Sequence, residues 1–211
     1  MTGVDLIAQQ DLDASVSSVI FSELASADYD SFEIIGTCRS DYTGTTTFTH
    51  SDALNLRFGV SNSIVTTNGK YEWSDVSAGN TYTTLDGEGV RASSGGSETS
   101  YMRVARIPDN YGVTGADALF RCASIRIRLF GLASGQYPTV QSTCSFASGR
   151  NPAPDNNSRD GWSMNVGRYM DNDAITDLEL KPLNGANFAS WNTSTSSGET
   201  SFILLGYKGS A

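Results

Sequence analysis

The residues that could support catalysis are scattered along this chain and form no recognisable motif. His50 is the single histidine. Although Ser51 and Asp52 follow it directly, adjacent residues cannot normally face one another as a catalytic triad requires. The chain contains neither a GxSxG nucleophile elbow nor a glycine-rich phosphate-binding loop. We therefore expect no enzymatic activity and no cofactor, and we interpret His50 as a surface loop residue.

One acidic segment offers oxygen ligands of the kind that calcium prefers. Asp171 and Asp173 flank an asparagine, and Asp177 follows a few residues later. The segment lacks the glycine and the distal glutamate of a twelve-residue calcium loop. Asp-Asn-Asp is also ordinary turn chemistry before a strand. Asp171, Asp173 and Asp177 are therefore a weak candidate for a calcium site, with a simple turn as the competing interpretation.

Aromatic residues in loop-like segments form the second group of candidates. Exposed aromatic rings can stack on sugars or contact a partner protein. In the competing interpretation, the same rings fill the ends of a β-sandwich and pack against its core. The residues concerned are Tyr71, Trp73, Tyr82, Tyr111, Tyr137 and Trp191.

The composition favours many short β-strands and excludes several classes of partner. Hydrophobic residues make up 38% and charged residues 18% of the 211 residues, and glycine is abundant. The net charge of −9, without a cluster of Lys and Arg, argues against nucleic-acid binding. No segment approaches the roughly 20 apolar residues of a membrane span, and the N-terminus lacks a signal-peptide pattern. We expect a protein that folds in a cytosol without processing and binds no membrane.

The cysteines indicate neither a disulfide framework nor a zinc site. Cys38, Cys122 and Cys144 are odd in number and show no CxxC spacing. Each lies in a strand-like segment. We expect buried free thiols that act as small core residues.

Alternating hydrophobicity predicts about ten strands. The pattern is clearest in residues 54–60 and in residues 119–130, where Ile125, Ile127 and Leu129 alternate with Ser124, Arg126 and Arg128. Residues 61–87 are rich in Ser, Thr, Asn and Gly, which suggests a long excursion with short edge strands. The remaining predicted strands cover residues 4–8, 16–21, 32–38, 101–107, 140–146, 162–166, 174–180 and 202–205. Such spacing predicts a single all-β domain over residues 1–211, as an antiparallel sandwich or a barrel.

Three hypotheses concern how these strands are used. Residues 174–207 are interpreted as a pair of core strands joined by a polar loop, which closes a sheet. Residues 1–12 form either an N-terminal arm that contacts a neighbouring subunit or an ordinary first strand. If their strands are neighbours, the arginines at positions 126 and 128 pair with Asp177 and Glu179 and fix the register.

Several short motifs follow one another in a recognisable order. The chain opens with VDLIAQQDLDASVSSVIFSEL, continues through YDSFEIIGTC and LNLRFGVSNS, and closes with GWSMNVGRYMDNDAITDLELKPLNGANF and TSFILLGYKG. This order resembles a group of small β-sandwich structural proteins of tailed bacteriophages, in which the end reads AIxxIxL, then Asn-Phe, then SFxLYG. Leu178 takes the second aliphatic position here, and Leu204-Leu205-Gly206 departs from the usual Leu-Tyr-Gly.

The resemblance implies a jelly-roll-like virion component and carries over no catalytic residues. The first function it implies is a capsid decoration or cement protein, present as a homo-oligomer with a trimer favoured. Such a protein binds the major capsid protein or other virion subunits. The second is a carbohydrate- or receptor-binding module of a tail fibre or tail tip, which uses the loop aromatics on a host glycan. A glycan-degrading enzyme is the least favoured hypothesis, although sequence alone does not exclude distant carboxylate pairs.

Overall fold

The computed structural model describes residues 3–42, 51–81, 88–108, 122–147, 159–184, 187–189 and 200–208. Four residues discussed above lie outside this part of the chain, namely His50, Tyr82, Tyr111 and Trp191. The described elements are β1 (Gly3–Leu12), β2 (Val19–Phe21), the 3-10 helix η1 (Ser26–Asp28), β3 (Ser31–Cys38), β4 (Ser51–Val60), β5 (Ser63–Ile64), β6 (Tyr71–Thr81), β7 (Glu88–Thr99), β8 (Met102–Pro108), β9 (Cys122–Phe130), β10 (Thr139–Ala147), β11 (Arg159–Tyr169), β12 (Ile175–Pro182) and β13 (Thr200–Lys208).

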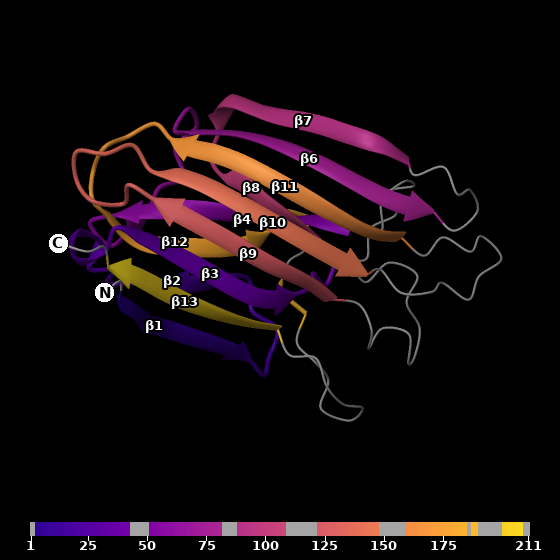
Figure 1. The fold of residues 1–211 in the computed structure, drawn as a ribbon, viewed down its shortest axis with the longest axis horizontal. Coiled ribbons are helices and arrows are strands. Elements are labelled where there is room, and N and C mark those ends of the chain that lie inside the picture. Colours follow the sequence, from indigo (N-terminus) through magenta and orange to yellow (C-terminus); the bar gives the residue numbers. More distant parts are fainter. Residues whose placement is uncertain are drawn as a thin grey trace.

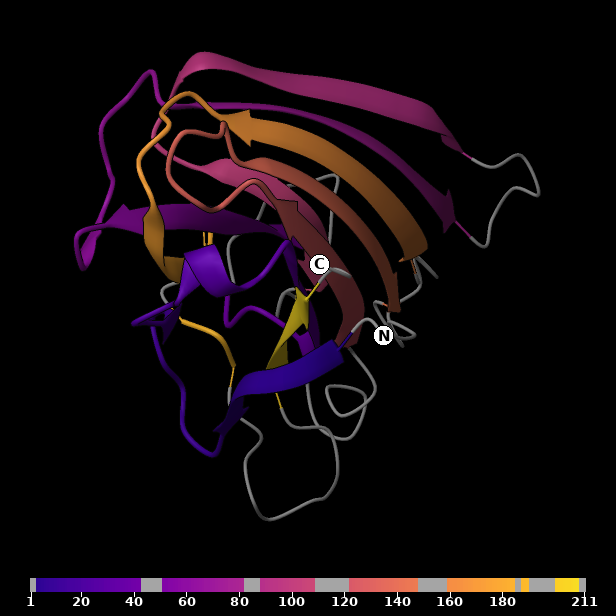
Figure 2. The same cartoon turned by 60° about the vertical axis from the view of Figure 1, so that its left-hand side comes forward.

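The strands form two antiparallel sheets that face each other (Figures 1 and 2). The larger sheet has the order β1-β13-β3-β9-β10-β11-β6-β7. The smaller sheet has the order β2-β12-β4-β5, and β8 also pairs with β4. The predicted antiparallel β-sandwich is confirmed.

The connections are those of a jelly roll with two insertions. In a jelly roll, eight strands alternate between two four-stranded sheets and place the first strand beside the last. Here β1-β13-β3-β9 and β2-β12-β4-β8 follow that pattern. The pair β6 and β7, inserted between β4 and β8, and the pair β10 and β11, inserted between β9 and β12, widen the larger sheet. The predicted jelly-roll character therefore holds for eight of the strands.

The apolar core lies between the two sheets. Every second residue of β9 is buried, as its alternation predicted, because one face of the strand packs on the core. Tyr71, Phe58 and Tyr169 form an aromatic cluster, with ring centroids 5.2 to 6.2 Å apart. The Tyr71 hydroxyl accepts a hydrogen bond from the Phe58 backbone N–H at 3.0 Å and donates one to the Val65 carbonyl at 3.0 Å.

A polar seam lies inside the sandwich along β8. The edge of β8 that faces away from β4 meets inward-pointing side chains of β10 and β11. The Val104 carbonyl accepts hydrogen bonds from the Ser142 hydroxyl and from Asn165 Nδ2, the latter at 2.8 Å. The Arg106 N–H donates to Ser163 Oγ at 3.3 Å, and the Arg106 carbonyl accepts from the thiol of Cys144 at 3.0 Å. These side chains satisfy backbone groups that an unpaired buried strand edge would otherwise leave without partners.

The polar seam reverses the usual orientation of β11. Ser163 and Asn165 point inward and are buried, whereas Trp162, Met164 and Val166 are exposed on the outer face. A Cβ atom at Gly167 would collide with the side chain of Met102, so this inward position accepts only glycine without rearrangement. The predicted strand is present, but its apolar side faces solvent.

Several sequence-based expectations about pairing are wrong. Strands β12 and β13 belong to different sheets, so residues 174–207 do not form a closing pair. The arginines of β9 pair with Glu33 of β3 rather than with Asp177 and Glu179 of β12, because β9 and β12 also lie in different sheets. Glu179 instead contacts Arg57 of β4 at 3.3 Å. A period of two residues identifies strands but does not assign them to sheets.

Three other expectations are resolved by the strands themselves. Residues 3–12 form an edge strand paired with β13, which is the ordinary first strand of the two interpretations. The excursion at 61–87 contains β6, an 11-residue strand that lies between β11 and β7.

Cys38 and Cys144 are buried free thiols, whereas Cys122 is exposed on β9, contrary to expectation. Burial raises the pKa of Cys144 to about 12 and also raises the pKa of Cys38 well above its ordinary value.

Candidate functional site

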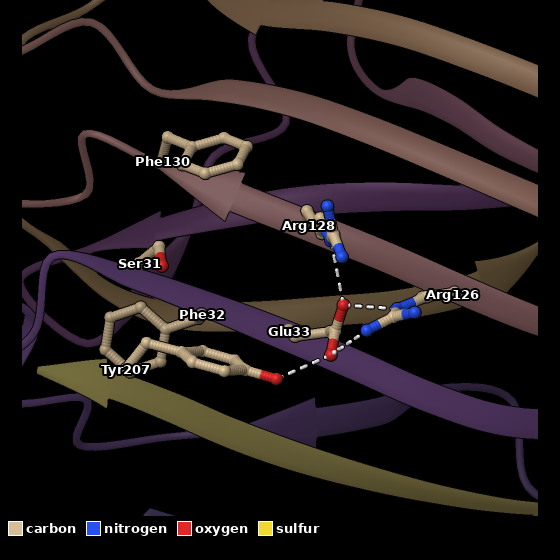
Figure 3. A pocket seen from close by; sticks show the side chains of 7 residues that line it. All are labelled: Ser31, Phe32, Glu33, Arg126, Arg128, Phe130 and Tyr207. Atoms are coloured by element: carbon tan, nitrogen blue, oxygen red, sulfur yellow. Dashed lines mark hydrogen bonds and ion pairs between the residues drawn. The ribbon is translucent and has the colours of Figure 1, made fainter. Parts of the chain in front are cut away.

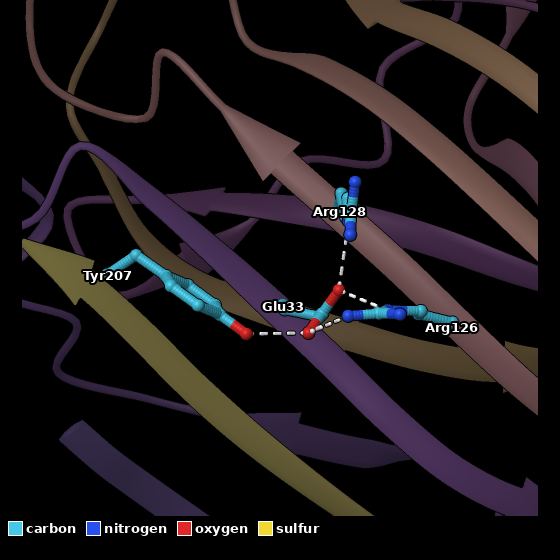
Figure 4. Close-up of polar contacts among 4 residues, drawn as sticks. All are labelled: Glu33, Arg126, Arg128 and Tyr207. Atoms are coloured by element: carbon cyan, nitrogen blue, oxygen red, sulfur yellow. Dashed lines mark hydrogen bonds and ion pairs between the residues drawn. The ribbon is translucent and has the colours of Figure 1, made fainter. Parts of the chain in front are cut away.

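A charged cluster occupies the outer face of the larger sheet, where β13, β3 and β9 run side by side (Figures 3 and 4). Glu33 lies at its centre, with only 2% of its side chain exposed. Arg126 donates from Nε and Nη2 to the two carboxylate oxygens, the latter at 3.0 Å. Arg128 donates from Nε to Oε1 at 3.0 Å, and the Tyr207 hydroxyl donates to Oε2 at 2.7 Å. Four hydrogen bonds therefore converge on one buried carboxylate.

Strand register brings these four residues together. Glu33 lies directly opposite Arg128 on β9, and the next pair on the same face is Ile35 with Arg126. Tyr207 pairs with Ser31, two residues before Glu33, so all four side chains project from one face. Side chains on neighbouring strands at these positions are close enough to interact directly or diagonally.

The cluster keeps Glu33 ionised over a wide pH range. Burial alone would raise the pKa of Glu33, but the hydrogen bonds from Arg126, Tyr207 and Arg128 outweigh it and lower the pKa to about 2. The same carboxylate raises the pKa of the Tyr207 hydroxyl. One buried negative charge beneath two arginines leaves a local excess of positive charge, in a chain whose net charge is −9.

Two adjoining pockets lie over this face and share the two arginines. One has a volume of about 260 Å³ and is lined by Glu33, Tyr207, Phe130 and the arginines. The other has a volume of about 440 Å³ and extends across β10 to β11. Its side chains form two cross-strand rows, Arg126–Thr143–Met164 and Arg128–Gln141–Val166. The floor therefore changes from cationic to polar to apolar across three strands.

This arrangement is suited to binding rather than to covalent chemistry. The only carboxylate in the two pockets, Glu33, is covered by its partners and held in the charged form, which makes it a poor proton donor or acceptor near neutral pH. The two arginines, in contrast, have half-exposed side chains, at 51% and 52%. Arginines held in place by one carboxylate can offer their remaining N–H groups to another anion.

The aromatic residues predicted to form a sugar-stacking surface do not gather in one place. Tyr71 and Trp73 lie in β6 and are buried, so the expectation that they are exposed in loops is wrong. They fill the interior, because inward positions of β6 face the core and the Arg103 guanidinium, which stacks on Trp73 at 4.6 Å. Tyr137 is exposed at 61% in the turn between β9 and β10.

The three aspartates proposed for calcium are dispersed. Asp171 forms an ion pair with Lys70 at 2.7 Å, and Asp177 is buried at a bulge in β12, where it accepts a hydrogen bond from Thr176 at 2.6 Å. Asp173 is exposed. Within the described ranges, no three His, Cys, Asp or Glu side chains are arranged to hold a metal ion. In the same part of the chain, no helix is long and apolar enough to cross a membrane.

Alternation along the sequence placed Arg126 and Arg128 on the polar face of their strand, but it did not identify the other members of the site. Glu33 interrupts an apolar run in β3, and a charged residue there is a signal for an outward position beside a basic strand. Met164 and Val166 were missed because their alternation with Ser163 and Asn165 resembles that of an ordinary half-buried strand.

Comparison with protein-family models, with curated proteins and with solved structures finds no match to this chain.

Proposed function

We propose that this protein is a structural subunit of a tailed-bacteriophage virion and that it decorates the outer capsid shell. The jelly-roll connectivity supports this proposal, because capsid-associated domains commonly use it. The order of motifs along the chain, which resembles small phage β-sandwich proteins, supports it independently. In this proposal the major capsid protein or another virion subunit is the partner, and several copies bind to each particle.

The observation that carries the proposal is the edge strand β1. Among the strands that the structure describes, it pairs only with β13, and its N-terminal half exposes Val4 at 53% and Leu6 at 62%. An edge strand presents unpaired backbone N–H and C=O groups, onto which a strand or arm of another subunit can add. Two exposed aliphatic side chains beside this edge provide the apolar contact that such strand addition requires.

Particle binding by a Leu6→Asp variant tests this proposal. Purified protein is mixed with particles of the encoding phage from which it has been removed, and cosedimentation is quantified. We expect saturable binding in a fixed ratio to the shell protein. Leu6→Asp should weaken it at least tenfold, because burying an aliphatic side chain contributes about 1.5 to 3 kcal/mol. The matched control is Ile20→Asp, since Ile20 is also an exposed aliphatic residue on an edge strand, β2 of the smaller sheet. Equal loss in both variants, or no binding by the unaltered protein, contradicts the proposal.

A carbohydrate- or receptor-binding module of a tail fibre or tail tip is the second candidate function. The pocket over β9, β10 and β11 favours it, since ligand pockets commonly have volumes of about 300 to 1,000 Å³ and this one measures about 440 Å³. Cosedimentation with isolated tails but not with empty heads would select this function over capsid decoration.

A further inference from the structure

Arg128 uses only part of its guanidinium within the protein. Its Nε donates to Glu33, and the described residues supply no hydrogen bond to its Nη1 or Nη2. These two terminal nitrogens form the fork that binds a carboxylate bidentately. Because the Glu33 contact fixes the guanidinium beforehand, a ligand that binds the fork loses little of its affinity to ordering this side chain.

The surroundings of the Arg128 fork fit a sugar better than a bare anion. Beside the arginines, Gln141 and Thr143 present an amide and a hydroxyl on the outer face of β10. Beyond them, Met164 and Val166 provide an apolar surface on β11. A pyranose ring carries hydroxyls at its rim and apolar C–H groups on its faces. Three neighbouring strands span about 10 Å, so one ring can reach all three kinds of side chain.

We propose that this pocket binds a carboxylate-bearing sugar, such as a uronic acid unit of an acidic polysaccharide. The carboxylate binds the terminal nitrogens of Arg128, with Arg126 adding positive charge beside it. The ring hydroxyls hydrogen-bond to Gln141 and Thr143, and one ring face packs on Met164 and Val166. This inference rests on the carbohydrate-binding function and defines its ligand class.

Charge complementarity favours an acidic ligand over a neutral glycan. Neutral sugars need no guanidinium pair, and a neutral ligand would remove water from the terminal nitrogens of Arg128 without offering them a negative charge in return. The polar row on β10 favours a glycan over an acidic protein segment, since it supplies partners for several hydroxyl groups. An acidic peptide is therefore one of the probes that test the inference.

Titration calorimetry with defined oligosaccharides tests the ligand class. The probes are trigalacturonate, its fully methyl-esterified form and a triglutamate peptide, each added to the full chain at low and high salt. Esterification removes the charge and keeps the rings, so it isolates the carboxylate contribution. We expect trigalacturonate to bind at least tenfold more tightly than the ester or the peptide, and added salt to weaken its binding.

The matched variants are Arg128→Gln and Arg168→Gln. Arg168 lies on the same outer face with a similarly exposed side chain, 55% against 52%, but pairs with Glu72 outside the pocket. Arg128→Gln should reduce trigalacturonate binding about tenfold or more, while Arg168→Gln leaves it unchanged. Equal losses in the two variants overturn the inference.

The remaining outcomes separate the inference from the function on which it rests. Equal binding of acid and ester overturns the carboxylate specificity but leaves a carbohydrate-binding function. Tighter binding of the peptide overturns the sugar assignment in favour of a protein partner. No binding of either oligosaccharide contradicts both the inference and the carbohydrate function.

Discussion

The two faces of the larger sheet both carry polar clusters, and the clusters differ in where their hydrogen bonds go. On the inner face, Ser142 and Asn165 direct their side chains to the backbone of β8. On the outer face, Glu33 accepts hydrogen bonds from Arg126 and Arg128, whose side chains are half-exposed (Figure 4). The inner cluster therefore satisfies the backbone of β8 within the protein, whereas the outer cluster leaves arginine N–H donors for a ligand.

The inner cluster also explains why apolar side chains lie beside the arginines on the outer face. Successive side chains of a strand point to opposite faces. Because Ser163, Asn165 and Gly167 occupy the inward positions in the middle of β11, Trp162, Met164 and Val166 face outward. Met164 and Val166 thus come to lie beside the arginines as a consequence of how the edge of β8 is satisfied.

Asp75→Asn should produce the largest loss of stability. Asp75 is buried at the inner face, and its carboxylate oxygens lie 4.0 Å from Arg103 Nη1 and 3.7 Å from Arg106 Nη2. The amide would remove the negative charge beside two largely buried guanidinium groups, which costs about 3 kcal/mol of unfolding free energy. Urea denaturation measures this loss.

The matched measurement is trigalacturonate binding by the same Asp75→Asn variant. The affinity should be unchanged, because Asp75 is buried at the inner face of the larger sheet and does not line the pocket. A loss of affinity in the folded variant would show that the two clusters are coupled.

Glu33→Gln should have an intermediate effect that depends on pH. The folded-state pKa of about 2 lies below the ordinary value of 4.5. The stabilisation by the ionised carboxylate is therefore present above about pH 4.5 and is lost as the pH falls towards 2. At neutral pH we expect a loss of about 2 kcal/mol in the variant, a figure reduced to allow for the half-exposed arginines.

Unfolding free energies of both proteins between pH 2 and pH 7 check this expectation. The difference between unaltered protein and variant should shrink as the pH falls. Glu72→Gln is the control, because Glu72 forms an exposed ion pair with Arg168 at 2.8 Å. It should cost less than about 1 kcal/mol. A Glu33→Gln effect that does not change with pH would contradict the assigned charge state.

Ser142→Ala should have the smallest effect of the three. It removes one of two hydrogen bonds to the Val104 carbonyl, and Asn165 Nδ2 retains the other at 2.8 Å. Since the acceptor remains satisfied, we expect a loss of about 1 kcal/mol, measured by thermal unfolding. A loss above about 3 kcal/mol would mean that the inner cluster behaves as one cooperative unit.

The alternation along individual strands was readable from the sequence because one face of most strands packs on the core. It correctly identified the inward residues of β9, such as Ile125 and Ile127. It did not identify the inward face of β11, since the buried edge of β8 reverses the usual preference there. Alternation could not predict the pairing of Arg128 with Glu33 either, because β3 and β9 are far apart in the chain and become neighbours only in the folded sheet.

The sequence by itself determined, through composition and a period of two residues, that this protein is built from many short antiparallel strands in a sandwich or a barrel. The tertiary structure alone decided which strands share a sheet and which side of β11 meets solvent. The physical reason is that alternation defines two faces of a strand but carries no information about its neighbours. The candidate site on β9, β10 and β11 depends on those neighbours, so it becomes visible only when the strands are assembled.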